Sequence, residues 1–114
     1  HRAGMETVRP GLRGCEVDEV AREVISRAGF GPAFSHSLGH GVGLAVHEGP
    51  GLRPESKTLL EAGMIVTIEP GIYVPGVGGC RVEDLVVLTE TGAESLSRSP
   101  YQEPGQTHPL EAWA

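Results

Sequence analysis

Residues 34–50 read FSHSLGHGVGLAVHEGP, and this stretch decides which fold the chain is expected to have. It contains three of the five histidines, His36, His40 and His47, with glycines placed between them. Histidine is the commonest metal ligand and the usual proton carrier near neutral pH. Glycine allows the backbone to approach a ligand closely. The combination indicates a functional site more than a packed core.

Three familiar kinds of site do not fit this stretch. His36 and His40 have the i, i+4 spacing of a helical metal pair. However, the glycines and the β-branched Val42 and Val46 disfavour a helix here. The run GHGVG is not a dinucleotide loop, because its third glycine comes one residue too early for GxGxxG. A zinc finger is excluded because no CxxC pair accompanies the histidines.

Short strands are expected at 33–37 and 42–47, on either side of the glycine-rich run, with a loop at 48–57. His40 and His47 are an odd number of residues apart, so on one flat strand they would face opposite sides. If both serve one site, a bend or bulge near residues 41–43 must re-aim one of them.

The composition describes one modest domain of 114 residues with a net charge of −6. This charge disfavours nucleic acid or an anionic membrane as a partner. No apolar run approaches the roughly 20 residues of a membrane span, and no signal-peptide pattern opens the chain. Two cysteines, Cys15 and Cys80, do not make a disulfide framework, so a reduced, cytoplasmic setting is expected.

Residues 15–28 are predicted to form a helix, because apolar side chains recur there at helical spacing. Glu16, Asp18 and Glu19 place negative charge near its start, which suits the helix dipole, and they are interpreted as a solvated face. Gly29 is a plausible C-terminal stop. The apolar stripe consists of Val17, Val20, Ala21, Val24, Ile25 and Ala28.

Two further strands are predicted to carry buried carboxylates. One covers 64–69, ends at Glu69 and continues at 72–74, and the other covers 81–89 with Glu83 on its Leu85 face. A hairpin turn at 75–79 separates them, and 94–97 is a candidate edge strand. Antiparallel pairing would bring Glu69 and Glu83 together, where two carboxylates need a cation or a shared proton. The alternative, that one or both lie in water at a strand end, stays open.

Three motifs, in this order and at these gaps, resemble the C-terminal part of the pita-bread metallopeptidases. They are SHSLGHGVGLAVHEGP at 35–50, GMIVTIEPGIYVPG at 63–76 and GGCRVEDLVVLTETG at 78–92. The helical segment 9–29 also matches the stretch that precedes the histidine motif in this family. The family includes Xaa-Pro aminopeptidase, Xaa-Pro dipeptidase (prolidase), methionine aminopeptidase and the metal-free creatinase.

The resemblance implies a set of metal ligands. In the family two aspartates, one histidine and two glutamates hold two metal ions. By motif the histidine is His40 and the glutamates are Glu69 and Glu83, with Glu83 bridging the metals. Manganese or cobalt is expected, with zinc as a third option, because oxygen ligands with one imidazole suit these ions. The two aspartates are expected upstream of residue 1, because neither Asp18 nor Asp84 fits the motif.

The resemblance also implies catalytic roles. His47 matches the histidine that hydrogen-bonds the substrate and the tetrahedral intermediate, and His36 matches one that lines the substrate pocket. Arg81 and the run GIYVPG fit the Xaa-Pro branch. Two metals can hold a hydroxide between them and polarise a peptide carbonyl. Glu69 can then pass a proton to the leaving nitrogen.

The expected architecture is therefore α+β, with a curved, mostly antiparallel sheet and a covering helix. Residues 1–98 are interpreted as the C-terminal half of a pita-bread domain and 99–114 as a tail. The expected activity is hydrolysis of the peptide bond before proline, in a peptide or dipeptide. A homo-oligomer or a missing N-terminal half is the expected protein partner. Two rivals remain: a non-enzymatic half-domain or interaction module, and a creatinase-like C–N hydrolase.

Overall fold

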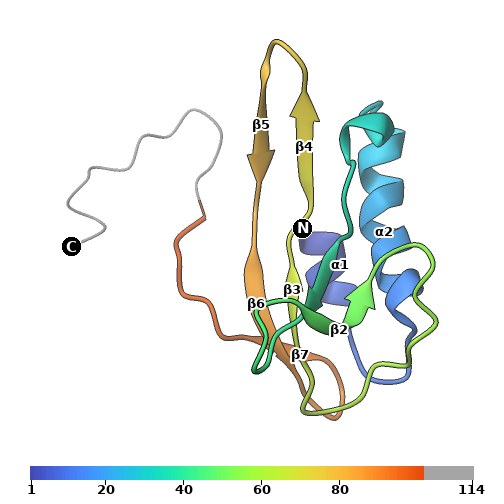
Figure 1. Ribbon diagram of the computed structural model, residues 1–114, viewed down its shortest axis with the longest axis vertical. Helices are drawn as coiled ribbons and strands as arrows, with labels where there is room; N and C mark the ends of the chain where they lie inside the picture. The colour runs from blue at the N-terminus through green and yellow to red at the C-terminus, as the bar shows by residue number, and fades with distance from the viewer. Residues whose placement is uncertain (102–114) are drawn as a thin grey trace.

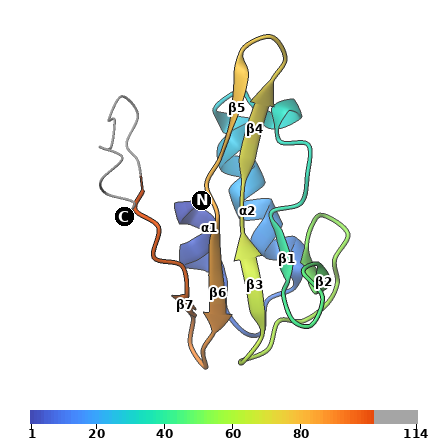
Figure 2. The same ribbon diagram turned by 60° about the vertical axis from the view of Figure 1, so that its left-hand side comes forward.

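The computed structural model describes residues 1–101, which form an antiparallel sheet with helices packed on one face (Figures 1 and 2). The helices are α1 (Arg2–Thr7) and α2 (Gly14–Arg27), followed by a 3₁₀ turn, η1 (Gly31–Ala33). The strands are β1 (Gly39–Gly41), β2 (Glu48–Leu52), β3 (Ile65–Ile68), β4 (Gly71–Val74), β5 (Gly78–Arg81), β6 (Asp84–Leu88) and β7 (Ala93–Ser95). The expected α+β class is confirmed.

Five strands form the main sheet in the order β2-β1-β3-β6-β7, and β4 pairs separately with β5. The two sheets share one long hairpin, because β3 continues into β4 and β5 continues into β6 (Figure 1). Ile68 pairs with Asp84 and Gly71 pairs with Arg81, so the same register runs through both parts. Glu69 and Glu83 therefore occupy opposite positions of this hairpin, at the break between the two sheets.

The break has a local cause. Pro70 has no backbone N–H to donate, so it cannot take part fully in the ladder. Only its carbonyl oxygen is used, accepting from the N–H of Val82 at 3.3 Å. The single strand predicted at 81–89 is accordingly wrong in extent, since the structure divides it into β5 and β6.

The core lies between the helices and one face of the main sheet. Val66 and Ile68 of β3 and Val86 and Leu88 of β6 all point to this side and are no more than 1% exposed. Val17 and Ala21 of α2 pack against them, which confirms the predicted apolar stripe over that part of the helix, whereas Val24 and Ala28 of the stripe are exposed. The other face of these strands carries Thr67 and Glu69, because side chains alternate along a strand. The scaffold and the candidate site thus lie on opposite faces of the sheet.

The strands expected at 33–37 and 42–47 are wrong. The glycine-rich run itself forms β1. A Cβ atom at Gly39 would lie 1.8 Å from the carbonyl oxygen of Thr67, and a Cβ atom at Gly41 would lie 2.1 Å from the carbonyl oxygen of Gly49. Only glycine permits the neighbouring strands to approach this closely. Residues 42–47 instead form an exposed loop, and β2 occupies the first half of the expected loop at 48–57.

Most other predicted elements are confirmed within a few residues. The helix predicted at 15–28 is Gly14–Arg27, the strand at 64–69 is Ile65–Ile68, and the edge strand at 94–97 is Ala93–Ser95. The hairpin turn predicted at 75–79 lies at 75–77. Helix α1 was not predicted. The expected tail at 99–114 lies, apart from its first three residues, outside the described residues.

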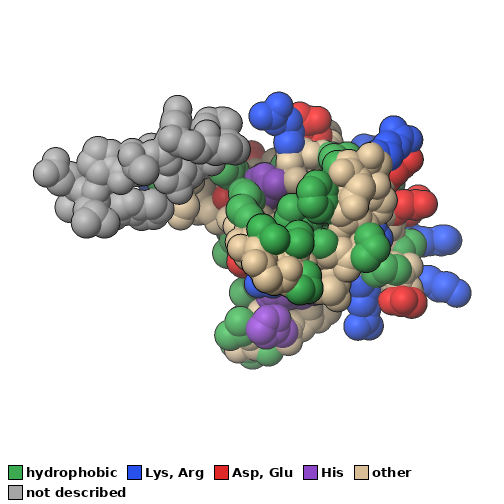
Figure 3. All heavy atoms as spheres, turned by 90° about the horizontal axis from the view of Figure 1, so that it is seen from above, with side chains coloured by type: hydrophobic (Ala, Val, Ile, Leu, Met, Phe, Trp, Pro, Cys, Tyr) green, Lys and Arg blue, Asp and Glu red, His purple; other side chains and the backbone are tan. Residues whose placement is uncertain are grey.

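Charged and hydrophobic side chains are separated on the face of the molecule that is seen from above. Viewed from above, they crowd the side on which α2 lies, while hydrophobic side chains gather over the end formed by the β4–β5 hairpin (Figure 3). No helix among the described residues is long and apolar enough to cross a membrane.

Candidate functional site

The candidate site is built around Glu69, a carboxylate at the end of β3 that is only 8% exposed. Thr67, two residues earlier on the same face, donates its hydroxyl to Glu69 Oε1 at 2.8 Å. The Nε2 atom of His40 lies 3.0 Å from the same oxygen, and Arg81 NH1 lies 3.4 Å from Oε2. A buried carboxylate is stable only when it is paired in this way or holds a metal.

Two hydrogen bonds orient His40. Its backbone N–H donates to Thr67 Oγ1 at 3.0 Å, and its ring Nδ1 lies 2.9 Å from the carbonyl oxygen of Gly41. Because a carbonyl oxygen can only accept, Nδ1 must carry the donated hydrogen. The other ring nitrogen, Nε2, is then directed at Glu69.

This arrangement brings two acceptors together. With Nδ1 protonated, the neutral His40 ring presents a lone pair at Nε2, and Glu69 Oε1 also presents lone pairs across 3.0 Å. A cation must lie between them, either a second ring proton or a metal ion. Two ligand atoms that each lie about 2.1 Å from one metal ion, with a right angle between the two bonds, are about 3.0 Å from each other. The donor set of His40 and Glu69 therefore fits a divalent metal.

His36 lies beyond Arg81 along the same surface. The Arg81 guanidinium is 5.8 Å from the centre of the Tyr73 ring, and the Tyr73 and His36 ring centres are 5.7 Å apart. His36 Nδ1 lies 2.7 Å from the carbonyl oxygen of Ser37, whereas its Nε2 is buried with no hydrogen-bond partner in the described structure. An unpaired buried polar atom is costly unless a ligand satisfies it.

His47 belongs to the same cluster although it lies on the exposed loop. Its ring centre is 4.3 Å from that of His40. The pairing register of β1 with β2 shifts between His40 and Gly41. The bend expected near 41–43 is thus present at 40–41, and it brings the two rings to one side.

Glu83 is the predicted ligand that the structure does not bring into contact with His40 or Glu69. It lies opposite Glu69 on the hairpin, but its side chain is exposed and has no ion pair among residues 1–101. The expectation of a buried Glu83 carboxylate is wrong, while that for Glu69 is confirmed. No group of three or more His, Cys, Asp or Glu side chains in the described part of the chain is arranged to hold a metal ion.

The two aspartates of the chain are engaged elsewhere. Asp84 faces the helical side, where its Oδ2 lies 3.0 Å from His1 Nε2 and accepts from the hydroxyl of Tyr101. Asp18 is 1% exposed and binds Arg22, so its interpretation as part of a solvated helix face is wrong. Glu19, by contrast, is exposed as expected. Neither aspartate contacts His40 or Glu69 in the described structure.

Two residues of the site were not predicted. Thr67 links His40 to Glu69, and Tyr73 lies between Arg81 and His36. Thr67 is a polar residue within an apolar strand, two positions before Glu69, and strand alternation alone would have placed it on the same face. No comparable signal marks Tyr73.

Comparison with known proteins identifies the family. The model of metallopeptidase family M24 matches residues 1–90. The chain belongs to metallopeptidase family M24. Over 98 residues, this M24 chain is 48% identical to the Xaa-Pro dipeptidase of Pyrococcus furiosus, covering 86% of the chain but 28% of that relative. The chain thus spans little more than a quarter of the length of the curated relatives it matches.

Solved structures agree with this assignment. The prolidase from Pyrococcus furiosus superimposes with a TM-score of 0.86 at 47% identity, covering 88% of this chain and 30% of that one. The Xaa-Pro dipeptidase from Bacillus anthracis superimposes with a TM-score of 0.87 at 48% identity, covering 89% of this chain and 28% of that one. An X-Pro aminopeptidase from Thermotoga maritima superimposes with a TM-score of 0.84 at 43% identity, covering 87% of this chain and 28% of that one. The open antiparallel sheet of this M24 chain is therefore that of the pita-bread prolidases, and the family resemblance seen in the sequence is confirmed.

Proposed function

We propose that this chain forms the metal-binding part of an exopeptidase that hydrolyses the peptide bond before proline, with a dipeptide or a longer peptide as substrate. The observation that carries the proposal is the pair of facing acceptors, His40 Nε2 and Glu69 Oε1, 3.0 Å apart. The kinship with Xaa-Pro dipeptidases supports the substrate class. Manganese or cobalt is the proposed metal, with zinc as the third option.

His40, Glu69 and Glu83 are the proposed metal ligands. Glu83 occupies the position opposite Glu69, where directly paired residues have Cβ atoms about 5 Å apart. An exposed glutamate has several rotamers of similar energy, so its carboxylate can turn toward Glu69 when a cation compensates the two negative charges. Two divalent ions bound there would supply Lewis acidity and lower the pKa of a water molecule.

The remaining side chains act on the proton and on the substrate. Glu69, held by Thr67 at Oε1, is proposed to accept a proton at Oε2 and deliver it to the leaving nitrogen. Arg81 sits 3.4 Å from Oε2 and balances the negative charge of Glu69 before the proton arrives. His47 is proposed to donate to the oxygen on which negative charge develops.

His36 is proposed to bind the substrate. Its Nε2 is buried without a partner, which is the state expected of a donor or acceptor that a bound peptide satisfies. The neighbouring Tyr73 ring provides an apolar surface next to it. A proline ring or an adjoining side chain of the peptide would cover that surface.

The proposed partner is further polypeptide, either from a longer chain or from a second copy. Ile65, Leu85 and Val87 lie on the site face of the sheet and are only partly buried. A face of this kind is stabilised when another layer covers it. The cytoplasm is the proposed setting, because Cys15 and Cys80 are both free thiols.

The test is a metal titration combined with a peptidase assay. Manganese or cobalt should bind to the unsubstituted protein, and Glu69→Gln should weaken this binding. In an active preparation, Glu69→Gln should also abolish cleavage of an Xaa-Pro substrate. Glu61→Gln is the matched control, since Glu61 is an exposed glutamate away from the site. Absence of metal binding would favour a non-enzymatic interaction module, and metal binding with cleavage of another C–N bond would favour the creatinase-like alternative.

A further inference from the structure

The segment 34–38, which leads into β1, is held by side chains and not by a strand ladder. It has no regular secondary structure, although Phe34 and Leu38 are 2% and 0% exposed. Buried backbone N–H and C=O groups must find partners elsewhere. Three of these groups, the carbonyl oxygens of Phe34 and His36 and the N–H of Leu38, find their partners on two side chains of α2.

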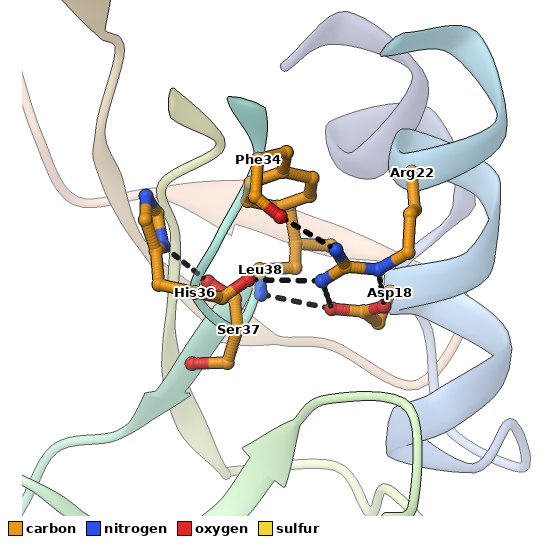
Figure 4. Close-up of polar contacts among 6 residues, drawn as sticks. All are labelled: Asp18, Arg22, Phe34, His36, Ser37 and Leu38. Atoms are coloured by element: carbon orange, nitrogen blue, oxygen red, sulfur yellow. Dashed lines mark hydrogen bonds and ion pairs between the residues drawn. The ribbon is translucent and has the colours of Figure 1, made fainter. Parts of the chain in front are cut away.

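Asp18 and Arg22 form a two-pronged ion pair one helical turn apart (Figure 4). Arg22 donates through Nε to Asp18 Oδ2 at 2.7 Å and through NH2 to Oδ1 at 3.0 Å. Arg22 also donates to the carbonyl oxygens of Phe34 and His36, each at 2.9 Å. The N–H of Leu38 donates to Asp18 Oδ1 at 3.0 Å. The pair thus binds alternate backbone groups at 34, 36 and 38.

Leu38 connects this ion pair to the candidate site. Its N–H is bound by Asp18, while its carbonyl oxygen accepts from the N–H of Glu69 at 2.7 Å. His40 follows two residues later. The Arg22 guanidinium also lies 4.2 Å from the centre of the Phe34 ring, whose edge contacts His36 with ring centres 5.1 Å apart. Both His36 and the His40–Glu69 pair therefore depend on the same anchored segment.

We propose that Asp18 and Arg22 are positioning residues of the candidate site. Their ion pair fixes the backbone of residues 34–38, and through it the ring of His36 and the alignment of His40 with Glu69. The importance of this for catalysis rests on the proposed function. The positional effect itself does not require activity and is tested separately.

The chemistry of arginine suits this role. Its planar guanidinium can bind one carboxylate with two N–H groups and still reach two carbonyl oxygens, which the point charge of lysine cannot do. The side-chain hydrogen bond to Asp18 raises the pKa of Arg22 above its already high ordinary value, which favours the charged guanidinium that makes these bonds. A buried aspartate left without this partner would carry an uncompensated charge.

The same helix contains a matched control. Glu23 and Arg27 form an acid–arginine ion pair with the same i, i+4 spacing. Their side chains are 56% and 78% exposed, whereas those of Asp18 and Arg22 are 1% and 28% exposed. The two pairs differ in what they touch, since only the first binds the 34–38 segment.

The experiment compares Arg22→Lys with Arg27→Lys, and Asp18→Asn with Glu23→Gln, in the metal-free 114-residue chain. Amide hydrogen exchange is followed by NMR, together with the ring signals of His36 and His40. In the Asp18 and Arg22 variants, exchange at Leu38 and Glu69 should accelerate about tenfold or more, while Val66 and Val86 change little. The His36 ring signals should shift in the same two variants. The control variants should leave all these signals unchanged.

Two results would overturn the inference. One is unchanged exchange at Leu38 and Glu69 in folded Arg22→Lys or Asp18→Asn protein. The other is an equal acceleration at Val66 and Val86, which would reveal a general effect on stability. If both variants fail to fold, hydrogen exchange is measured in the unsubstituted protein instead. The Nε–H of Arg22 should exchange far more slowly than the Nε–H of Arg27. Equal exchange rates would overturn the inference.

A cobalt titration of the same samples separates the inference from the proposed function. If the unsubstituted protein binds no cobalt, as judged by the ring signals of His40, the metal site is refuted while the exchange data still decide the positional effect. If it binds cobalt, Arg22→Lys should weaken the affinity more than Arg27→Lys does. Equal affinities in these two variants would count against an effect of the pair on His40 and Glu69.

Discussion

The N–H of Glu69 donates to the carbonyl oxygen of Leu38 at 2.7 Å, and this bond joins the segments that carry His40 and Glu69, two of the three candidate metal ligands. Leu38 lies two residues before His40, and Glu69 directly follows β3. The separation of the two ligand side chains is thus set by backbone pairing. A substitution can therefore disturb the site either by changing how these two backbone segments fit together or by changing the chemistry of a side chain.

Gly39→Ala should strongly destabilise the protein. A Cβ at this position would lie 1.8 Å from the backbone oxygen of Thr67, so β1 and β3 would have to separate. We expect a loss in the free energy of unfolding of about 3 kcal/mol or complete failure to fold. Gly92→Ala is the control, because nothing lies within 4 Å of its Cβ position. Urea unfolding measures both, and a Gly39→Ala protein as stable as Gly92→Ala would contradict the close approach of the strands.

Glu83→Ala should lower metal affinity more than His36→Ala does. Glu83 lies opposite Glu69 and is a proposed ligand, whereas His36 contacts the site only through aromatic neighbours. Calorimetric titration with manganese measures both affinities. If the two substitutions cost the same, or if His36→Ala costs more, Glu83 is not a ligand.

His47→Ala should affect turnover more than metal content. Its ring lies beside that of His40 but on an exposed loop, which suits a group that donates to the substrate. In an active preparation we expect kcat to fall by on the order of 10²-fold or more, as for loss of one oxyanion donor. Metal content should be measured on the same sample, and a parallel loss of metal would make His47 a ligand.

The 114-residue polypeptide on its own should not hold two tightly bound metal ions. Two divalent cations carry four positive charges, whereas Glu69 and Glu83 supply two negative ones. Asp18 and Asp84 are committed to other partners, so they cannot add to the set. Metal analysis after dialysis against manganese or cobalt should give fewer than two ions per chain. Two retained ions with rapid cleavage of an Xaa-Pro substrate would refute the expected ligand set.

The fold was predictable where the sequence pattern is local. Helix α2 follows from a 3.6-residue period and β3 from an apolar run ending at Glu69. Strand β1 was not predictable in this way, because its glycines are required by the backbone of Thr67 and Gly49, which approach them only in the folded sheet. The motifs at 35–50, 63–76 and 78–92 together nevertheless pointed to the family that the comparison confirms, since they reflect chemistry and not local conformation.

The candidate site was predictable in its residue types but only in part in its contacts. His40 and Glu69 were expected to meet, and they do. Asp18 was misinterpreted because its spacing to Arg22 equals the spacing of Glu23 to Arg27, and this second pair is exposed. Nothing in the helix distinguishes the two pairs. Burial is decided by the segment 34–38, which approaches only one of them.

The alternation along β3 has a consequence for insertions and deletions. Val66 and Ile68 face the helices while Thr67 and Glu69 face the site, so every residue of this strand is committed to one side. Loss or gain of a single codon within β3 would exchange the two sets and abolish packing and chemistry together. The hairpin turn at 75–77 carries no such alternation and contains no proposed site residue. Length variation compatible with a working protein should therefore be concentrated in this turn and absent from β3.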